Sequence, residues 1–129
     1  MAIRYSNRAL ERIIKNGDGW RVGYHSQVQY QGLVGTDDWA FELTKAELDD
    51  FYRLLTQLVD TMESMAAELM DQERISCEAE SDLLWVEVEG YPHDYSLRLI
   101  LNANRRCEGN WAAGIAPKLL QGLKAMGLD

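Results

Sequence analysis

The feature of this sequence that most constrains its fold is one long amphipathic segment near the middle of the chain. Thr44 and Glu47 are spaced as in a capping box, in which the Thr44 hydroxyl accepts a hydrogen bond from the Glu47 amide and the Glu47 carboxylate accepts one from the Thr44 amide. Apolar residues then recur at alternating spacings of three and four, which predicts a helix over 45–71 with one broad apolar face. At about 1.5 Å per residue this helix would be roughly 40 Å long, about double a typical strand, so part of its face must cover more than one small sheet. The apolar stripe consists of Leu48, Phe51, Leu55, Leu58, Met62, Met65 and Leu69, widened by Leu54, Val59 and Ala66.

Segments with the alternating pattern of half-buried strands precede this helix. Residues 20–25 alternate apolar and polar side chains, and the next segment, 29–35, contains two glycines that bend or end it. After a turn, residues 39–43 place three large apolar side chains on one face. The sequence therefore predicts three strands before the long helix.

A short helix is predicted ahead of these strands. Leu10, Ile13 and Ile14 have helical spacing within residues 6–16, and Gly17 is suitable as a C-terminal stop. This helix would present a basic stripe formed by Arg4, Arg8, Arg12 and Lys15.

The second half of the chain repeats the order of strands followed by a helix. Alternation predicts strands at 75–80 and 83–90 on either side of a turn, then a nearly continuous apolar strand and a short strand that ends at Trp111. Pro117 suits the first turn of a closing helix, where the missing amide of proline costs nothing. Each half thus contains strands, a tryptophan near the end of the last strand, and a helix.

These elements predict an α+β fold of duplicated antiparallel sheet-plus-helix units, with one long central helix and a shorter C-terminal helix. The length of 129 residues suits a single domain over 1–129, in which the internal pseudo-repeat covers approximately 18–71 and 75–126. Three tryptophans are expected inside, where sheets meet helices: Trp20, Trp39 and Trp111.

Composition and charge limit the functional classes. The 13 basic and 21 acidic residues give a net charge of −8, which repels phosphate backbones and argues against non-specific nucleic-acid binding. No stretch approaches the roughly 20 apolar residues that span a bilayer, and the N-terminal residues lack the apolar core of a secretory signal. We therefore expect no membrane association and a cytoplasmic protein. In that compartment Cys77 and Cys107 are expected to be small buried side chains rather than a disulfide.

Several blocks of the sequence resemble a known family. They are GDGWRVGY, QGLVGTDDWAFELTKAELDDFYRLL, ISCEAESDLLWVEVEGYP, YSLRLIL and RRCEGNW, which together run from about Gly17 to Leu123. They look like the cyanobacterial family called domain of unknown function 1818. The resemblance implies the Whirly-like fold, which single-stranded-DNA-binding transcriptional regulators also have. It implies no activity, because function resides in sites rather than in folds.

Acidic side chains gather on the strands of the second half. If the strands at 75–80 and 83–90 form a hairpin, Glu78 and Glu80 lie beside Glu87 and Glu89 on one face. Opposed carboxylates can act as a general acid and base. The favoured interpretation is a solvated face, because alternation places charge outward, Arg98 offsets part of it, and charge on strands suppresses edge pairing. The main alternative is a surface that binds a protein partner.

The sequence contains no close pairing of metal ligands and no nucleotide-binding or nucleophile motif. Cys77, Cys107, His25 and His93 are adequate zinc ligands only if the fold gathers them. We therefore predict no catalytic residues, no metal and no cofactor, and a protein that is not an enzyme.

The sequence favours a non-catalytic binding or assembly protein, whose partner is another protein or a second copy of the same chain. The candidate partner surface lies at the end of the long helix, because methionine side chains adapt to partners; the residues are Met62, Met65 and Met70. The alternative is a protein that binds single-stranded nucleic acid, and an enzyme of unrecognised type comes third. The candidate phosphate contacts are Arg4, Arg8, Arg12, Arg105 and Arg106.

Overall fold

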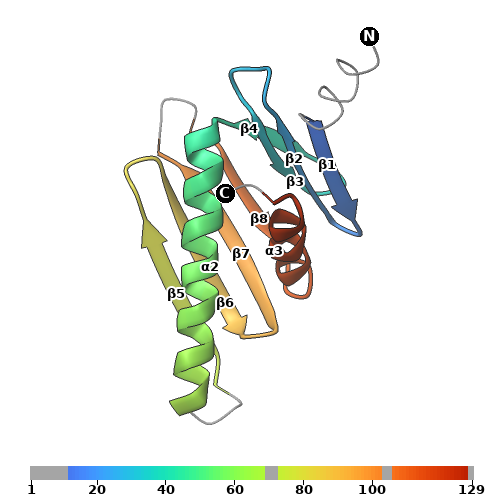
Figure 1. Cartoon of the computed structure of the whole chain (residues 1–129). Coiled ribbons are helices and arrows are strands. Elements are labelled where there is room, and N and C mark those ends of the chain that lie inside the picture. Colours follow the sequence, from blue (N-terminus) through green and yellow to red (C-terminus); the bar gives the residue numbers. More distant parts are fainter. Residues whose placement is uncertain (1–11, 69–72, 103–105, 128–129) are drawn as a thin grey trace.

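Two four-stranded antiparallel sheets and two helices make up the fold, in agreement with the predicted α+β class (Figure 1). The computed structural model describes residues 12–68, 73–102 and 106–127. The first sheet has the order β1-β2-β3-β4 and consists of β1 (Arg12–Gly17), β2 (Trp20–His25), β3 (Gly32–Gly35) and β4 (Ala40–Leu43). The second sheet has the order β5-β6-β7-β8 and consists of β5 (Ile75–Glu80), β6 (Leu84–Tyr91), β7 (Asp94–Leu101) and β8 (Glu108–Trp111). The helices are α2 (Lys45–Glu68) and α3 (Ala116–Ala125).

The predicted helix over 6–16 is wrong in its second half, where the chain forms β1. This strand pairs with β2 in a continuous antiparallel register from Arg12 opposite His25 to Gly17 opposite Trp20. Asp18 and Gly19 make the two-residue turn, for which the positive φ of Gly19 (86°) is suited. Pairing along a whole neighbouring strand outweighs a helical spacing that only three apolar residues support. Residues 6–11 lie outside the described residues, and the strands before α2 number four rather than three among those described.

The predicted capping box is confirmed at the start of α2. The Glu47 amide donates to the Thr44 hydroxyl (3.1 Å), and the Thr44 amide donates to Glu47 Oε1 (2.8 Å). The described helix continues to Glu68, and residues 69–71 of the predicted range lie outside the described residues. Its buried residues are Glu47, Leu48, Phe51, Leu54, Leu55, Leu58, Val59 and Met62, so the predicted apolar stripe faces the core.

Each sheet is covered chiefly by the helix that the other half of the chain provides. α2 follows the first sheet in sequence but lies mainly across β5 and β6 of the second sheet, and it also contacts β3 and β4 (Figure 1). α3 follows the second sheet but packs on β2 of the first sheet as well as on β7. The approach of α3 to β2 is close, because a Cβ at Gly122 would lie 2.3 Å from the Trp20 ring. The length of α2 is therefore explained by the sheet it covers, and the two halves cannot form separate cores.

Trp111 joins the two sheets. Its side chain is fully buried, and its indole N–H donates to the carbonyl oxygen of Gly35 at the end of β3 (2.8 Å). Its ring stacks on Phe51 of α2 (6.1 Å between centroids) and contacts Trp39 before β4 (5.3 Å). Trp20 and Trp39 are half-buried and pack against the same core, which confirms the predicted interior position of the three tryptophans.

Candidate binding site

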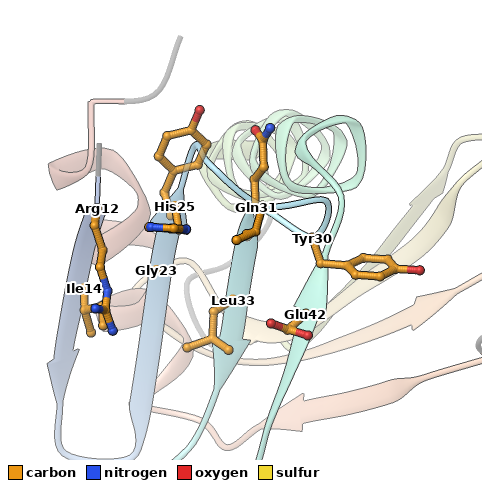
Figure 2. Close-up of a pocket in the computed structure, with 11 residues that line it drawn as sticks. Arg12, Ile14, Gly23, His25, Tyr30, Gln31, Leu33 and Glu42 are labelled. Atoms are coloured by element: carbon orange, nitrogen blue, oxygen red, sulfur yellow. The ribbon is translucent and has the colours of Figure 1, made fainter. Parts of the chain in front are cut away.

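The outer face of the first sheet carries a groove. Strand register places Ile14, Gly23, Leu33 and Glu42 in one row across β1, β2, β3 and β4. This row lies on the face opposite to Trp20, whose ring contacts α3, because successive side chains along β2 alternate between faces. The depression over this row has a volume of about 330 Å³, and Figure 2 shows the labelled residues that line it.

The depression exists because Gly23 has no side chain between Ile14 and Leu33. A Cβ at Gly23 would lie 3.5 Å from Leu33 Cβ and 3.6 Å from Ile14 Cγ1, which are ordinary contacts. Its tightest neighbour would be the Ile13 carbonyl oxygen at 3.3 Å. Gly23 therefore forms the floor of the groove, and the two aliphatic side chains form its walls.

Polar residues form the rim. Arg12 and His25 are paired across β1 and β2, and the His25 amide donates to the Gln31 carbonyl oxygen (2.7 Å). Arg12, His25 and Gln31 therefore form a second row, next to the row that contains Gly23. Figure 2 shows the Arg12 side chain running along β1 toward Ile14. Glu42 lies on β4 at the opposite edge. The groove thus has a cation at one edge, a carboxylate at the other and an apolar centre.

The loop between β2 and β3 adds a further apolar side chain to the groove. Val28 lines the depression and is 43% exposed, while Ile14 is 52% exposed. Tyr30 belongs to the same loop, and its ring extends past β4 and away from Ile14 (Figure 2). Of the three large exposed hydrophobic side chains among the described residues, two therefore gather at this groove, and the third is Met65. An exposed apolar patch with a polar rim is typical of an interaction site.

The predicted methionine surface is reduced by the structure. Met62 belongs to α2, and its side chain is fully buried in the core because the second sheet covers this part of the helix. Met65 is 38% exposed, and its sulfur lies 3.9 Å from Cys77 Sγ. Met70 lies outside the described residues. Met65 is thus the one predicted partner residue that the described part of the chain exposes.

The predicted basic stripe is wrong within the described residues. Because residues 12–17 form a strand, Arg12 and Lys15 are three positions apart and point to opposite faces rather than along one helix side. Arg106 is exposed and precedes β8. The other candidate phosphate contacts, Arg4, Arg8 and Arg105, lie outside the described residues. Of the predicted arginines, the structure therefore places Arg12 in the groove.

The acidic strand face is open to solvent, as predicted. Glu78 lies directly opposite Glu87 across β5 and β6, and Glu87 lies opposite Arg98 on β7. Arg98 also pairs with Glu108 (3.1 Å) and lies over the Trp85 ring, whose indole N–H donates to Glu78 (3.0 Å). These contacts spread the charge over an open surface and form no enclosed acid and base pair.

The cysteines and histidines are distributed over separate elements. Cys77 and Cys107 are half-buried thiols with no disulfide between them, and burial raises the pKa of the Cys77 thiol above its usual value. His25 lies at the groove, whereas His93 lines a separate depression of about 570 Å³ between the last turns of α2 and the β6–β7 turn. Among residues 12–68, 73–102 and 106–127, no three His, Cys, Asp or Glu side chains are grouped so that they could hold a metal ion. No helix within these same ranges is long and apolar enough to cross a membrane.

Comparison with known proteins gives a family and a solved relative. Residues 15–126 match the family described as domain of unknown function (DUF1818). The chain is also similar to a protein of unknown function from Prochlorococcus sp. NATL2A, described as a member of the DUF155 family, whose crystal structure matches with a TM-score of 0.83 and 29% sequence identity. That match covers 91% of this chain and 99% of the Prochlorococcus chain. No curated protein matches the sequence. Gly23, Leu33 and Glu42 lie within the part that matches the family, and Arg12 and Ile14 precede it.

Proposed function

This chain belongs to the DUF1818 family, and we propose that it is a non-catalytic binding or assembly protein that receives a protein partner on the outer face of its first sheet. The observation that carries the proposal is the row in which exposed Ile14 and half-buried Leu33 flank the side-chain gap at Gly23. An aliphatic or aromatic side chain of a partner can enter this gap and remove apolar surface from water on both molecules.

The shape of the groove favours a protein over a small molecule. Its volume of about 330 Å³ is at the lower end for ligand pockets, which enclose most of the surface of their ligands. Here the floor is a sheet face, and the walls are two side chains that stand above it. A surface of this form contacts one side of a larger object, and Val28 on the adjoining loop extends the contact.

A chemical role for the groove has less support than binding. Its lining includes one histidine and one carboxylate, but His25 and Glu42 stand in different rows and on strands separated by β3. At about 4.8 Å per strand, they are roughly 10 Å apart in the direction across the sheet. General acid and base groups act within hydrogen-bond reach of one reacting atom. Binding through the apolar centre therefore accounts for more of the site.

Single-stranded nucleic acid is the second candidate ligand. It is motivated by the Whirly-like fold that the family resemblance implies and by the exposed Arg12 at the groove. Stacking platforms for bases require exposed aromatic rings along a basic track. Glu42 at the far edge and the interior positions of Trp20, Trp39 and Trp111 support a protein partner instead.

Site-specific cross-linking tests the proposal. A photoreactive amino acid replaces Leu33 in the groove or, as the control, Ser96 on the outer face of the second sheet, and each protein is irradiated in native lysate with and without nuclease. We expect a nuclease-resistant protein adduct from position 33 that disappears in an Ile14→Glu background and persists in a Met65→Glu background. Adducts that are indifferent to Ile14→Glu but lost with Met65→Glu would move the interface to α2. Adducts with nucleic acid at position 33 would favour the second candidate.

A further inference from the structure

We propose that the occupant of the groove is a second copy of this chain, bound face to face about a twofold axis that runs along the strands between β2 and β3. The inference rests on the proposed function and names its partner. Two copies related by a twofold axis meet through the same surface, so the surface must be complementary to itself. The groove satisfies this condition in both shape and charge.

The shape complementarity comes from the central row. An axis in the interface plane and parallel to the strands places β2 of one copy over β3 of the other. Gly23 and Leu33 are directly opposite each other in the register of β2 and β3. Each Leu33 then meets the gap above the partner's Gly23, so one contact is made twice. Ile14 and Val28 surround this centre with the two most exposed large hydrophobic side chains of the described residues.

The charge complementarity comes from the two edge strands. The same axis places β1 of one copy over β4 of the other, and these strands form the opposite edges of the first sheet. Arg12 therefore lies at the edge that faces the partner's Glu42, and Glu42 lies at the edge that faces the partner's Arg12. A twofold axis across the strands would instead place β1 over the partner's β1 and β4 over the partner's β4, so that the two Arg12 side chains share one edge and the two Glu42 side chains share the other. The distribution of charge thus selects the axis along the strands.

The size of the face predicts a weak dimer. Four strands at about 4.8 Å each and about five residues at roughly 3.3 Å give a face of roughly 300 Å². This is well below the roughly 800 Å² that each partner buries in an interface of standard size. We therefore expect a monomer at low concentration and a reversible dimer at higher concentration.

Sedimentation equilibrium of the full chain between about 5 µM and 1 mM tests the proposal. We expect a two-protomer mass to appear across this range and the association constant to fall at least fivefold for Arg12→Glu and for Glu42→Arg. The double variant with both changes restores the association, because each contact then has its charges exchanged. An equimolar mixture of the two single variants also associates more strongly than either variant alone, because in the mixed dimer each of the two charge contacts pairs a glutamate of one copy with an arginine of the other.

Gly23→Ala tests the shape of the contact independently of charge. The added methyl group fills the gap at ordinary contact distances from Leu33 and Ile14 and requires only a small shift from the Ile13 carbonyl oxygen at 3.3 Å, so we expect a folded protein whose association falls about tenfold. Ser96→Ala on the second sheet is the matched control, and we expect its association constant to equal that of the unchanged protein. Far-ultraviolet circular dichroism of each variant establishes that it is folded.

The outcomes separate this inference from the proposed function. A chain that stays monomeric up to 1 mM, or a double charge exchange that fails to restore association, overturns the twofold dimer. Ile14-dependent cross-linking of another protein would then still support the proposed function. A dimer that is indifferent to both Gly23→Ala and Ile14→Glu overturns the twofold dimer and argues against the groove as the interface.

Discussion

Replacement of Trp111 with phenylalanine tests whether this residue joins the two sheets. The change keeps one ring in the core but removes the indole N–H that donates to Gly35 and part of the ring system that packs against Phe51 and Trp39. Trp85→Phe is the matched control, because Trp85 also donates its indole N–H, in this case to the exposed Glu78 on the open face of the second sheet. The two variants make the same chemical change in different surroundings.

The expected cost follows from burial. Loss of the buried hydrogen bond leaves the Gly35 carbonyl oxygen without this donor and costs about 1–2 kcal/mol. The void left by the missing part of the indole, on the order of 40 Å³, adds about 1 kcal/mol at roughly 24 cal/mol per Å³. We therefore expect Trp111→Phe to lower the free energy of unfolding by about 2–3 kcal/mol. Trp85→Phe is expected to cost less than about 0.5 kcal/mol, because water replaces the lost partner at an exposed site.

Urea unfolding followed by far-ultraviolet circular dichroism measures both values without relying on tryptophan fluorescence. For a domain of this size, a loss of 2–3 kcal/mol corresponds to a fall in Tm of about 8–12 °C. Equal urea midpoints for the two variants, or a larger loss for Trp85→Phe, would refute the role assigned to Trp111.

Three further predictions concern the helices and the core. Thr44→Ala removes half of the capping box and is expected to cost about 1 kcal/mol in urea unfolding, whereas a loss below 0.3 kcal/mol would show that the cap contributes little. Burial, with a smaller contribution from the charge of Glu63, raises the pKa of Tyr95 to about 12 from its ordinary value of 10. Because the unfolded chain loses this proton first, Tyr95 makes stability fall as pH rises from about 10 to about 12. Tyr95→Phe should abolish that part of the fall, and identical urea midpoints against pH for both proteins would contradict the assignment. Gly122→Ala should lower Tm although alanine favours helices by about 1 kcal/mol, because its Cβ would lie 2.3 Å from the Trp20 ring; a rise in Tm would show that the ring moves aside without cost.

Local patterns predicted most of the elements. The capping box at Thr44 fixed the start of α2, because both of its hydrogen bonds join residues three positions apart. Strict alternation predicted β5 and β6, because one face of the second sheet is buried and the other is open to solvent. These signals lie within a few consecutive residues, so they can be recognised in the sequence without knowledge of the tertiary structure.

The errors arose where a short segment satisfied two patterns. Ile13 and Ile14 have helical spacing with Leu10, yet they lie on opposite faces of β1. The signal that would have corrected this prediction is Asp18-Gly19, since Asp-Gly between apolar segments is a strong indicator of a two-residue hairpin.

The packing of the helices and the groove depend on contacts between distant segments. No local period shows that α2 covers the second sheet, and for this reason Met62 could not be recognised as a core residue rather than a surface residue. The groove depends on register, because Gly23 becomes a floor only when Ile14 and Leu33 stand on either side of it. The indole-to-carbonyl bond of Trp111 likewise joins residues 76 positions apart.

The unequal cover of the two sheets has a consequence for hydrogen exchange. A helix of 10 residues packs on the first sheet, whereas a helix of 24 residues lies across the second. We expect the backbone amides of β1 and β2 to exchange with deuterium sooner than those of β6 and β7. The reason is that the first sheet, which the shorter helix covers, opens locally at a lower free energy. The half of the molecule that opens more readily is then also the half that bears the groove. Slower deuterium uptake in β2 and β3 would consequently report an occupied groove even when the complex dissociates too quickly to be isolated.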